Sequence, residues 1–208
     1  MKLNPPIAVC KLCFKEYQPI TLLDIFDEHN CYCKKCISEI SPVFIKFKVG
    51  RYKAIAIYEY SHKIQSLLYQ FKGCFDVELF GIFIERFRRE LKFRYCDYVL
   101  IPAPSFKKDD EERGFNHVVE MFKVLKLPFL DIVVKVGKIK QASLNAEKRS
   151  EINKYLKLKE KPNLKNKKVL IVDDVYTTGS TIKSMINLIE PLHPKTIEVL
   201  VMSKTTLN

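Results

Sequence analysis

The sequence predicts an α/β protein, in which a mostly parallel sheet is flanked by helices and preceded by a small cysteine-rich segment. Three observations support this fold class. Strand-like and helix-like patterns alternate from about residue 52 to the end of the chain. The apolar stretch that ends at Val172 is followed by two acidic residues and a hydroxyl-rich turn. Two C-x-x-C pairs lie within the first 36 residues.

The composition is that of an ordinary globular protein. The chain has 208 residues, of which 47% are hydrophobic and 29% charged, enough to bury one good core. No apolar run approaches the roughly 20 residues of a membrane span. The N-terminus lacks an apolar signal core, so we expect a cytoplasmic protein without membrane insertion.

The formal net charge of +12 is large. Such a charge favours a polyanionic partner or a highly phosphorylated ligand, because it raises the local concentration of anions. A lysine-rich proteome is the alternative explanation.

Five of the seven cysteines lie near the N-terminus. The pairs Cys10/Cys13 and Cys33/Cys36 are separated by 19 residues, a spacing typical of a structural zinc site with four thiolate ligands. Cys31 or His29 is an alternative for one ligand, and free or redox-active thiols are the other interpretation. We expect this zinc-binding finger to span residues 1–42.

The next segment, residues 43–96, is predicted to form edge and hood elements. Tyr52–Tyr60 has the alternation of a strand, and Ser61 is expected to cap a helix that ends at Gly73. A second helix is expected over Asp76–Lys92. Its polar face carries basic side chains, interpreted as a solvated face or a nucleic-acid contact: Arg86, Arg88, Arg89 and Lys92.

Residues 97–208 are predicted to form the core. The expected strands are Tyr98–Ile101, Leu130–Val134, Lys168–Val172 and Thr196–Met202. The expected helices are Asn116–Leu125 and Thr181–Ile189. Because strands alternate with helices, right-handed crossovers and a parallel sheet follow. Ligands of such sheets bind at the carboxyl ends of the strands.

The turn after Val172 has the chemistry of such a ligand site. Asp173 and Asp174 offer carboxylate acceptors that suit a vicinal diol. The following hydroxyl-rich turn leads into a helix N-terminus, which suits a phosphate monoester. A ribose 5-phosphate carries both groups.

This stretch, VLIVDDVYTTGST at residues 169–181, resembles the signature for phosphoribosyl pyrophosphate (PRPP) of type I phosphoribosyltransferases. The resemblance implies a type I phosphoribosyltransferase-like fold. It also implies that Asp173 and Asp174, the candidate catalytic residues, hold the ribose hydroxyls. The 5-phosphate would be held by Thr177, Thr178, Gly179, Ser180 and Thr181.

Other segments narrow the resemblance to the ComF competence family, of the ComFC and GntX type. They occur in the order of that family: the cysteine pairs, Tyr69–Lys72, Ile101–Pro104, Arg113–Asn116, and Gln141 with Arg149 and Asn153. The family implies a PRPP-binding protein that handles single-stranded DNA during natural transformation. Its implied partners are a ComF-type helicase and other competence proteins, and Mg²⁺ would accompany PRPP.

Three further segments are assigned on this basis. In the loop after Ile101, backbone donors from Ala103, Ser105 and Phe106 would bind pyrophosphate, and Arg113 would pair with a phosphate. The run Lys107–Glu112 is expected to be a mobile solvated loop. Residues 135–149 occupy the place of the type I lid, where Lys138, Lys140 and Arg149 are candidate ligand or DNA contacts, although an arginine and a threonine would be usual near the two lysines.

If the protein is a catalyst, a nitrogen nucleophile displaces pyrophosphate from ribose C1. The sequence shows no acceptor pocket after Ile189, so the hood is expected to come from the helices between Ser61 and Lys92. Two other functions stay open: a purine or pyrimidine salvage phosphoribosyltransferase, and a non-catalytic DNA-handling adaptor on the same fold.

Overall fold

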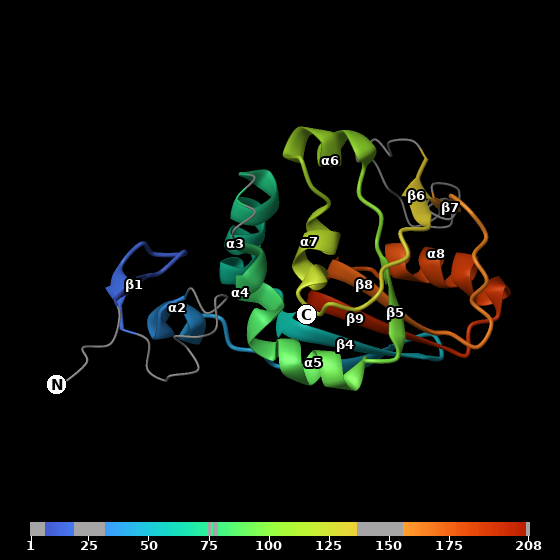
Figure 1. The fold of residues 1–208 in the computed structure, drawn as a ribbon, viewed down its shortest axis with the longest axis horizontal. Coiled ribbons are helices and arrows are strands. Elements are labelled where there is room, and N and C mark those ends of the chain that lie inside the picture. Colours follow the sequence, from blue (N-terminus) through green and yellow to red (C-terminus); the bar gives the residue numbers. More distant parts are fainter. Residues whose placement is uncertain (1–6, 19–31, 75, 77–78, 137–155, 207–208) are drawn as a thin grey trace.

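A computed structural model describes residues 7–18, 32–74, 76, 79–136 and 156–206. Within these residues the architecture is a central sheet with helices on both faces and a small cysteine-rich segment at one end (Figure 1). No helix among the described residues is long and apolar enough to cross a membrane.

The central sheet has five strands in the order β3-β4-β9-β8-β5. Their bounds are β3 Ile45–Val49, β4 Tyr52–Glu59, β9 Thr196–Lys204, β8 Lys168–Tyr176 and β5 Tyr98–Pro102. All neighbours are parallel except β3, which is antiparallel to β4. The mostly parallel sheet is therefore confirmed. The hairpin strand β3 was not predicted.

Both faces of the sheet are apolar, as expected for a parallel sheet covered on each side. On β8, Leu170 and Val172 belong to the buried cluster that also contains the apolar residues of the helices between residues 62 and 123. Val169 and Ile171 belong to the opposite cluster, with helix α8 (Ser180–Ile189). The apolar run of this strand is nearly continuous because both of its faces are buried.

The helix α3 (His62–Gly73) confirms the expectation for this segment. The Ser61 hydroxyl accepts the Ile64 N–H at 3.3 Å, and the apolar positions Ile64, Leu67, Leu68 and Phe71 are buried. The single helix expected over Asp76–Lys92 was wrong. Instead α4 (Phe80–Ile84), the 3-10 turn η2 (Glu85–Phe87) and α5 (Arg88–Arg94) follow one another.

The interruption coincides with a competing hydrogen bond. The buried hydroxyl of Tyr58 donates to the Phe83 carbonyl at 3.0 Å, which is the acceptor that a continuous helix would offer to Phe87. The expected apolar side of the segment is still buried, because Leu79, Phe83, Phe87 and Leu91 all pack into the core.

The expected loop over Lys107–Glu112 was also wrong, because residues Lys107–Arg113 form helix α6 (Figure 1). Charge alone suggested solvation, and α6 indeed has no buried residue. Its order comes from Gly114, which ends the helix with φ of 80° and donates its N–H to the Asp110 carbonyl at 2.7 Å. The next helix, α7 (His117–Lys123), lies within the expected range.

After α7 the chain meets the far edge of β5. Leu100 donates its N–H to Pro128 at 2.8 Å and accepts the Leu130 N–H at 2.8 Å, and Phe129 forms an isolated parallel bridge with Leu100. The strand predicted over Leu130–Val134 is shifted. It is β6 (Val133–Lys135), which pairs with β7 (Leu156–Leu158) in a separate antiparallel ribbon.

A topological switch point, where the connections from two neighbouring strands leave in opposite directions, lies between β5 and β8. The connection from β5 to Phe129 runs away from β8 and carries α7 in one buried cluster. The connection from β8 to β9 runs the other way and carries α8 in the opposite cluster. Parallel sheets bind ligands outside the strand ends at such a point.

The cysteine-rich segment contains the ribbon β1 (Ala8–Val9) and β2 (Glu16–Tyr17) and the short helix α2 (Lys34–Ser38). Cys10, Cys36 and Ile40 belong to the same buried cluster as the apolar face of α3. The segment therefore packs onto the hood helices. The boundary between residues 42 and 43 stays a prediction.

Candidate functional site

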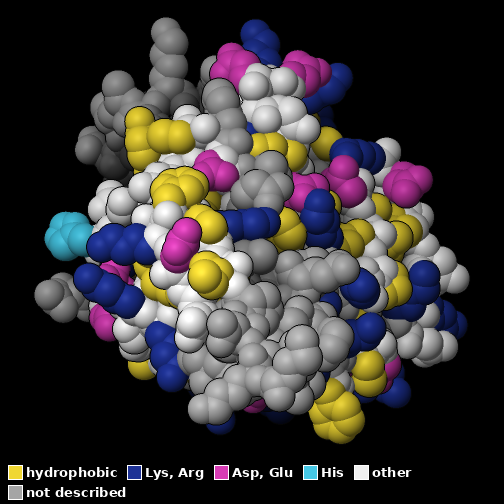
Figure 2. Space-filling view, turned by 60° about the vertical axis from the view of Figure 1, so that its left-hand side comes forward, with side chains coloured by type: hydrophobic (Ala, Val, Ile, Leu, Met, Phe, Trp, Pro, Cys, Tyr) yellow, Lys and Arg dark blue, Asp and Glu magenta, His cyan; other side chains and the backbone are white. Residues whose placement is uncertain are grey.

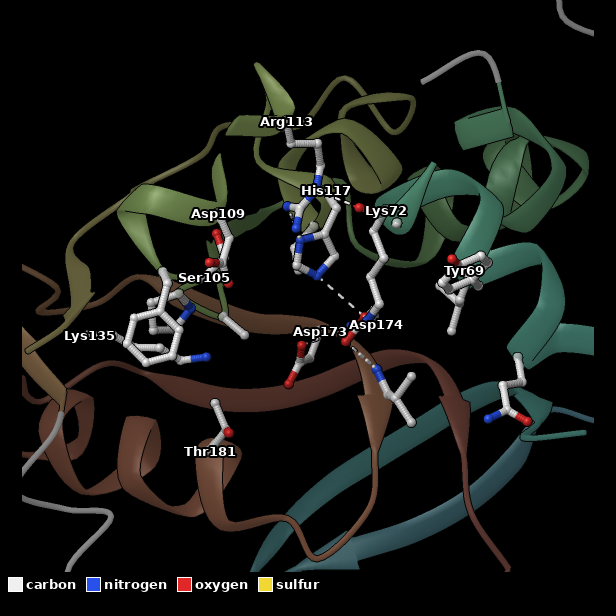
Figure 3. Close-up of a pocket in the computed structure, with 18 of the residues that line it drawn as sticks. Tyr69, Lys72, Ser105, Asp109, Arg113, His117, Lys135, Asp173, Asp174 and Thr181 are labelled. Atoms are coloured by element: carbon white, nitrogen blue, oxygen red, sulfur yellow. Dashed lines mark hydrogen bonds and ion pairs between the residues drawn. The ribbon is translucent and has the colours of Figure 1, made fainter. Parts of the chain in front are cut away.

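A cavity of about 580 Å³ opens at the carboxyl ends of the strands, at the switch point. Its walls come from the end of α3, the loop after β5, helices α6 and α7, the strand β6 and the start of α8 (Figure 3). Its polar lining residues include Tyr69, Lys72, Ser105, Asp109, Arg113, His117, Lys135, Asp173, Asp174 and Thr181.

The acidic pair lies at the base of this cavity because β8 is longer than its neighbour. The strand β5 ends at Pro102, which pairs with Val172, whereas β8 continues to Tyr176 beside β9. Asp173 and Asp174 thus follow directly after the last residue pair of β5. They are 9% and 7% exposed, so water reaches them only through the cavity.

Asp174 is held by three donors. Lys72 Nζ lies 2.5 Å and His117 Nε2 lies 3.3 Å from its Oδ2, while Oδ1 accepts the Val175 N–H at 2.7 Å (Figure 3). Burial alone would raise the pKa of this carboxyl. The His117 hydrogen bond and the Lys72 charge outweigh the burial, so the pKa lies well below its usual range.

Asp173 has the opposite environment. Its Oδ1 accepts the Asp174 N–H at 2.9 Å, and no described cation forms an ion pair with it. Burial, followed by the negative charge of Asp174, raises its pKa well above the usual value. Asp174 is therefore the more acidic of the two carboxyls.

The hydroxyl-rich turn lies between Tyr176 and α8. Gly179 has φ of 72°, and a Cβ at this position would collide with the ring of Tyr176. That ring packs edge-on against Phe47, with 4.7 Å between the centroids. Glycine is thus favoured at position 179 for two reasons: the positive φ of the turn and the closeness of the Tyr176 ring.

Two hydroxyl side chains of the turn form a hydrogen bond with each other. Thr178 Oγ1 and Ser180 Oγ lie 2.8 Å apart, and Thr181 lines the cavity. Thr177 and Thr178 are exposed, so they face solvent in this structure. The Ser180 N–H donates to Thr178 Oγ1 at 3.4 Å, and the N–H groups of Thr181 and Ile182 follow in the first turn of α8.

The loop after β5 contributes fewer donors than the sequence suggested. Ala103 lines the cavity, but its N–H is donated to the Val172 carbonyl at 2.8 Å. The Ser105 hydroxyl is also engaged, since it donates to Asp110 and accepts from Asn116 Nδ2 at 3.0 Å. The backbone N–H groups of Ser105 and Phe106 are donated to no described residue.

Arg113 is committed to protein contacts. Its Nε donates to the Lys72 carbonyl at 3.0 Å, and its Nη1 donates to Asp110 at 3.2 Å and to His117 Nδ1 at 3.1 Å. A fork of two adjacent donors toward a phosphate is therefore not free in this arrangement. Arg113 instead ties together α3, α6 and α7.

His117 and Asp109 were missed at the sequence level, and Lys72 was noted only within a family motif. Asp109 lay in the segment expected to be a loop. The available signal for His117 was its position directly after Arg113–Asn116, where Asn116 caps α7 by accepting the Val118 and Val119 N–H groups. The predicted lid residues Lys138, Lys140 and Arg149 lie outside the described residues.

The cysteines of the two C-x-x-C pairs come together. The four sulfur atoms of Cys10, Cys13, Cys33 and Cys36 all lie within 4.8 Å of one another, and those of Cys13 and Cys33 are 3.7 Å apart. An ion with four thiolate ligands at about 2.3 Å gives an edge of about 3.8 Å between sulfurs. The arrangement fits a zinc-finger-like segment. The alternatives Cys31 and His29 lie outside the described residues.

The comparisons with known proteins agree with this geometry. The phosphoribosyl transferase domain family matches residues 111–204. Competence protein ComFC of Bacillus subtilis is 25% identical over 187 residues, which cover 86% of this chain and 77% of the relative. Competence protein ComFC of Streptococcus pneumoniae is 28% identical over 203 residues, which cover 94% of this chain and 87% of the relative.

These matches support a ComFC-type phosphoribosyltransferase-like protein. The ComFC relatives align along most of its length, whereas the domain family covers the part from α6 to β9. That part contributes the acidic pair, the hydroxyl-rich turn and His117.

Solved structures with a similar chain path are more distant. Adenine phosphoribosyltransferase from Saccharomyces cerevisiae is 15% identical with a TM-score of 0.40, covering 83% of this chain and 89% of that chain. A hypoxanthine phosphoribosyltransferase from Staphylococcus aureus is 13% identical with a TM-score of 0.37, covering 59% of this chain and 70% of that chain.

The unequal environments of the two carboxyls predict opposite effects on stability. Because the pKa of Asp173 is raised, its favourable contribution is present at low pH and is lost as the pH rises through the raised value. Asp173→Asn should therefore become increasingly more stable than the wild type from pH 5 to 8. Thermal melts at several pH values measure this difference.

The matched substitution Asp174→Asn should behave differently. Its lowered pKa means that its contribution is already present above the ordinary aspartate pKa and is lost only in acid. This variant should be less stable than the wild type by about 1–3 kcal/mol throughout pH 5–8. Equal destabilisation by both substitutions at pH 8 would contradict this assignment.

Proposed function

We propose that the cavity binds PRPP together with Mg²⁺. The observation that carries the proposal is the placement of two adjacent, buried carboxyl groups at the switch point, next to the start of α8. A ribose diol offers two hydroxyl groups to such a pair. A phosphate suits the free N–H groups at the start of a helix.

Each part of the ligand has a matching part of the cavity. Asp173 and Asp174 hold the ribose hydroxyls, and the turn Thr177–Thr181 holds the 5-phosphate. The pyrophosphate lies toward the backbone N–H groups of Ser105 and Phe106 and toward Lys135, which line the same cavity. Ala103 contributes to the wall, and Arg113 supports Lys72 and His117. The lid lysines Lys138 and Lys140, outside the described residues, would neutralise the leaving group, and Arg149 is a further lid or DNA contact.

Mg²⁺ would bind in this site together with the pyrophosphate group of PRPP. Hard oxygen ligands and retained waters are what Mg²⁺ prefers, and pyrophosphate and ribose oxygens supply them. The role of the protein is to hold the ligand and to exclude water from it.

We further propose that the protein handles single-stranded DNA in the cytoplasm during natural transformation, with a ComF-type helicase and other competence proteins as partners. The support is the net charge of +12 and the two relatives that are competence proteins. Figure 2 shows Lys and Arg side chains spread over the face on the side of the cysteine-rich segment, with Asp and Glu between them. Such a distribution suits sequence-independent contacts with phosphates.

Helix α5 offers the best-defined basic surface for this role. Arg89, Lys92 and Arg94 are exposed on it, and Phe93 between them is 87% exposed. Cations beside an exposed aromatic ring are the usual means of binding single strands, because bases stack on the ring. Arg88 is less available, since it pairs with Glu85 at 3.4 Å.

For the cysteine cluster we propose a structural Zn²⁺ bound by Cys10, Cys13, Cys33 and Cys36. All four ligand positions are taken by protein sulfur, so none is left for a substrate or water. The Cys33 N–H donates to Cys10 Sγ at 3.3 Å, a contact that stabilises a thiolate.

PRPP binding is tested by isothermal titration in the presence of Mg²⁺. Asp173→Ala and Asp174→Ala should each weaken binding at least about tenfold, since each removes a charged or hydrogen-bonding group from the site. Asp131→Ala is the matched control, because Asp131 is an exposed aspartate paired with Lys159 outside the cavity. Absence of binding by the wild type would leave the non-catalytic adaptor. Release of pyrophosphate on addition of a purine or pyrimidine base would instead favour salvage.

DNA binding is tested with a single-stranded oligonucleotide over a range of salt concentrations. The logarithm of the association constant should fall with the logarithm of salt, with a slope of about −0.7 for each phosphate contacted. Arg89→Glu with Lys92→Glu should reduce both affinity and slope. The same charge change at Lys46 and Lys48, which are exposed on β3, is the control. No binding of the wild type at low salt would rule out this role.

The zinc site predicts about one zinc ion per purified chain. Cys13→Ser should lower the zinc content and the melting temperature, because the ion links β1, β2 and α2. Cys74→Ser is the control, since Cys74 is an exposed free cysteine. Metal analysis and thermal melts measure both effects. A zinc content well below one per chain would refute the site.

A further inference from the structure

His117 is a largely buried imidazole at the centre of the site. The family motifs in the sequence did not include it. It is the first residue of α7, and its side chain is 11% exposed. One ring nitrogen, Nδ1, lies 3.1 Å from Arg113 Nη1, and the other, Nε2, lies 3.3 Å from Asp174 Oδ2 (Figure 3). The imidazole therefore bridges a cation and an anion.

The two partners determine where the imidazole carries its proton. A guanidinium group has only donors, so Nδ1 must accept from Arg113 and is unprotonated. The proton is then on Nε2, which donates to Asp174. His117 is thus a neutral ring in one defined tautomer.

The acceptor positions of Asp174 show why this donor matters. Lys72 and His117 occupy Oδ2, and the Val175 N–H occupies one position of Oδ1. One position on Oδ1 is left for a ligand hydroxyl. The Lys72 side chain is 36% exposed, compared with 11% for His117, so Lys72 is the partner that a ligand can displace.

We propose that His117 is a positioning residue, which keeps Asp174 oriented toward the cavity as a neutral Nε2–H donor whose tautomer is set by Arg113. This inference rests on the proposed PRPP site and deepens it. When Lys72 turns from Asp174 toward the phosphates of the ligand, His117 remains as the fixed donor to the carboxylate.

Arg113 makes this arrangement rigid. Its other contacts, with the Lys72 carbonyl and with Asp110, fix the guanidinium relative to α3 and α6. Asp110 is itself held by Ser105 and Asn116. The position of His117 is therefore coupled to three walls of the cavity.

The test compares His117→Gln with the wild type, because the Gln amide can donate at the place of Nε2 without titrating. At pH 8 the variant should bind Mg²⁺–PRPP within about threefold of the wild type, whereas His117→Phe should bind at least about tenfold more weakly.

Two further measurements complete the test. His62→Gln is the matched control, since His62 is exposed at the start of α3, and it should bind Mg²⁺–PRPP like the wild type. Nitrogen NMR of labelled histidine, with the His117 signals assigned from their loss in His117→Gln, should show the Nε2–H tautomer without any ligand.

The outcomes are distinct. Equal affinity of His117→Gln and His117→Phe for Mg²⁺–PRPP, or an Nδ1–H tautomer, overturns the inference. Failure of the wild type to bind PRPP refutes the proposed function, and the NMR measurement then still decides the tautomer. Thermal melts show whether each variant is folded before its affinity is interpreted.

Discussion

The burial of a carboxylate pair at the end of β8 is the constraint on which the rest of the site depends. Two adjacent charges in a poorly hydrated place are unfavourable, so one must be neutralised or compensated. Lys72 and His117 compensate Asp174, and Asp173 is left with a raised pKa. The hood helices are therefore more than a cover, because Lys72 of α3 supplies the counter-charge to Asp174.

Much of this arrangement could be predicted from the sequence, because local patterns specify it. The apolar run before Asp173 predicts a strand that is buried on both faces. The Ser61 cap and the apolar spacing from Ile64 to Phe71 predict α3, and the cysteine spacing predicts the four-thiolate cluster. The hydroxyl-rich turn was placed correctly because glycine and the first residues of a helix leave a local signature.

The remainder depends on contacts between distant segments, which no local pattern contains. Helix α6 looks like a solvated loop until Asp110 is seen to join Ser105, Arg113 and Asn116. The break before α5 coincides with the Tyr58 hydroxyl, which reaches the segment from β4. Likewise, Arg113 resembles a phosphate ligand in the sequence, whereas its donors are engaged by Lys72, Asp110 and His117.

Helix α3 has a consequence for how the protein can be divided. One side of it, with Tyr69 and Lys72, lines the ligand cavity, and another, with Ser66 and Gln70, lines a second hollow of about 420 Å³ against the cysteines. A truncated chain without its first 42 residues would lose Cys10, Cys36 and Ile40, which share a buried cluster with the apolar face of α3. The cysteine-rich segment thus supports the helix that lines the ligand site, and we regard it as part of the same structural unit.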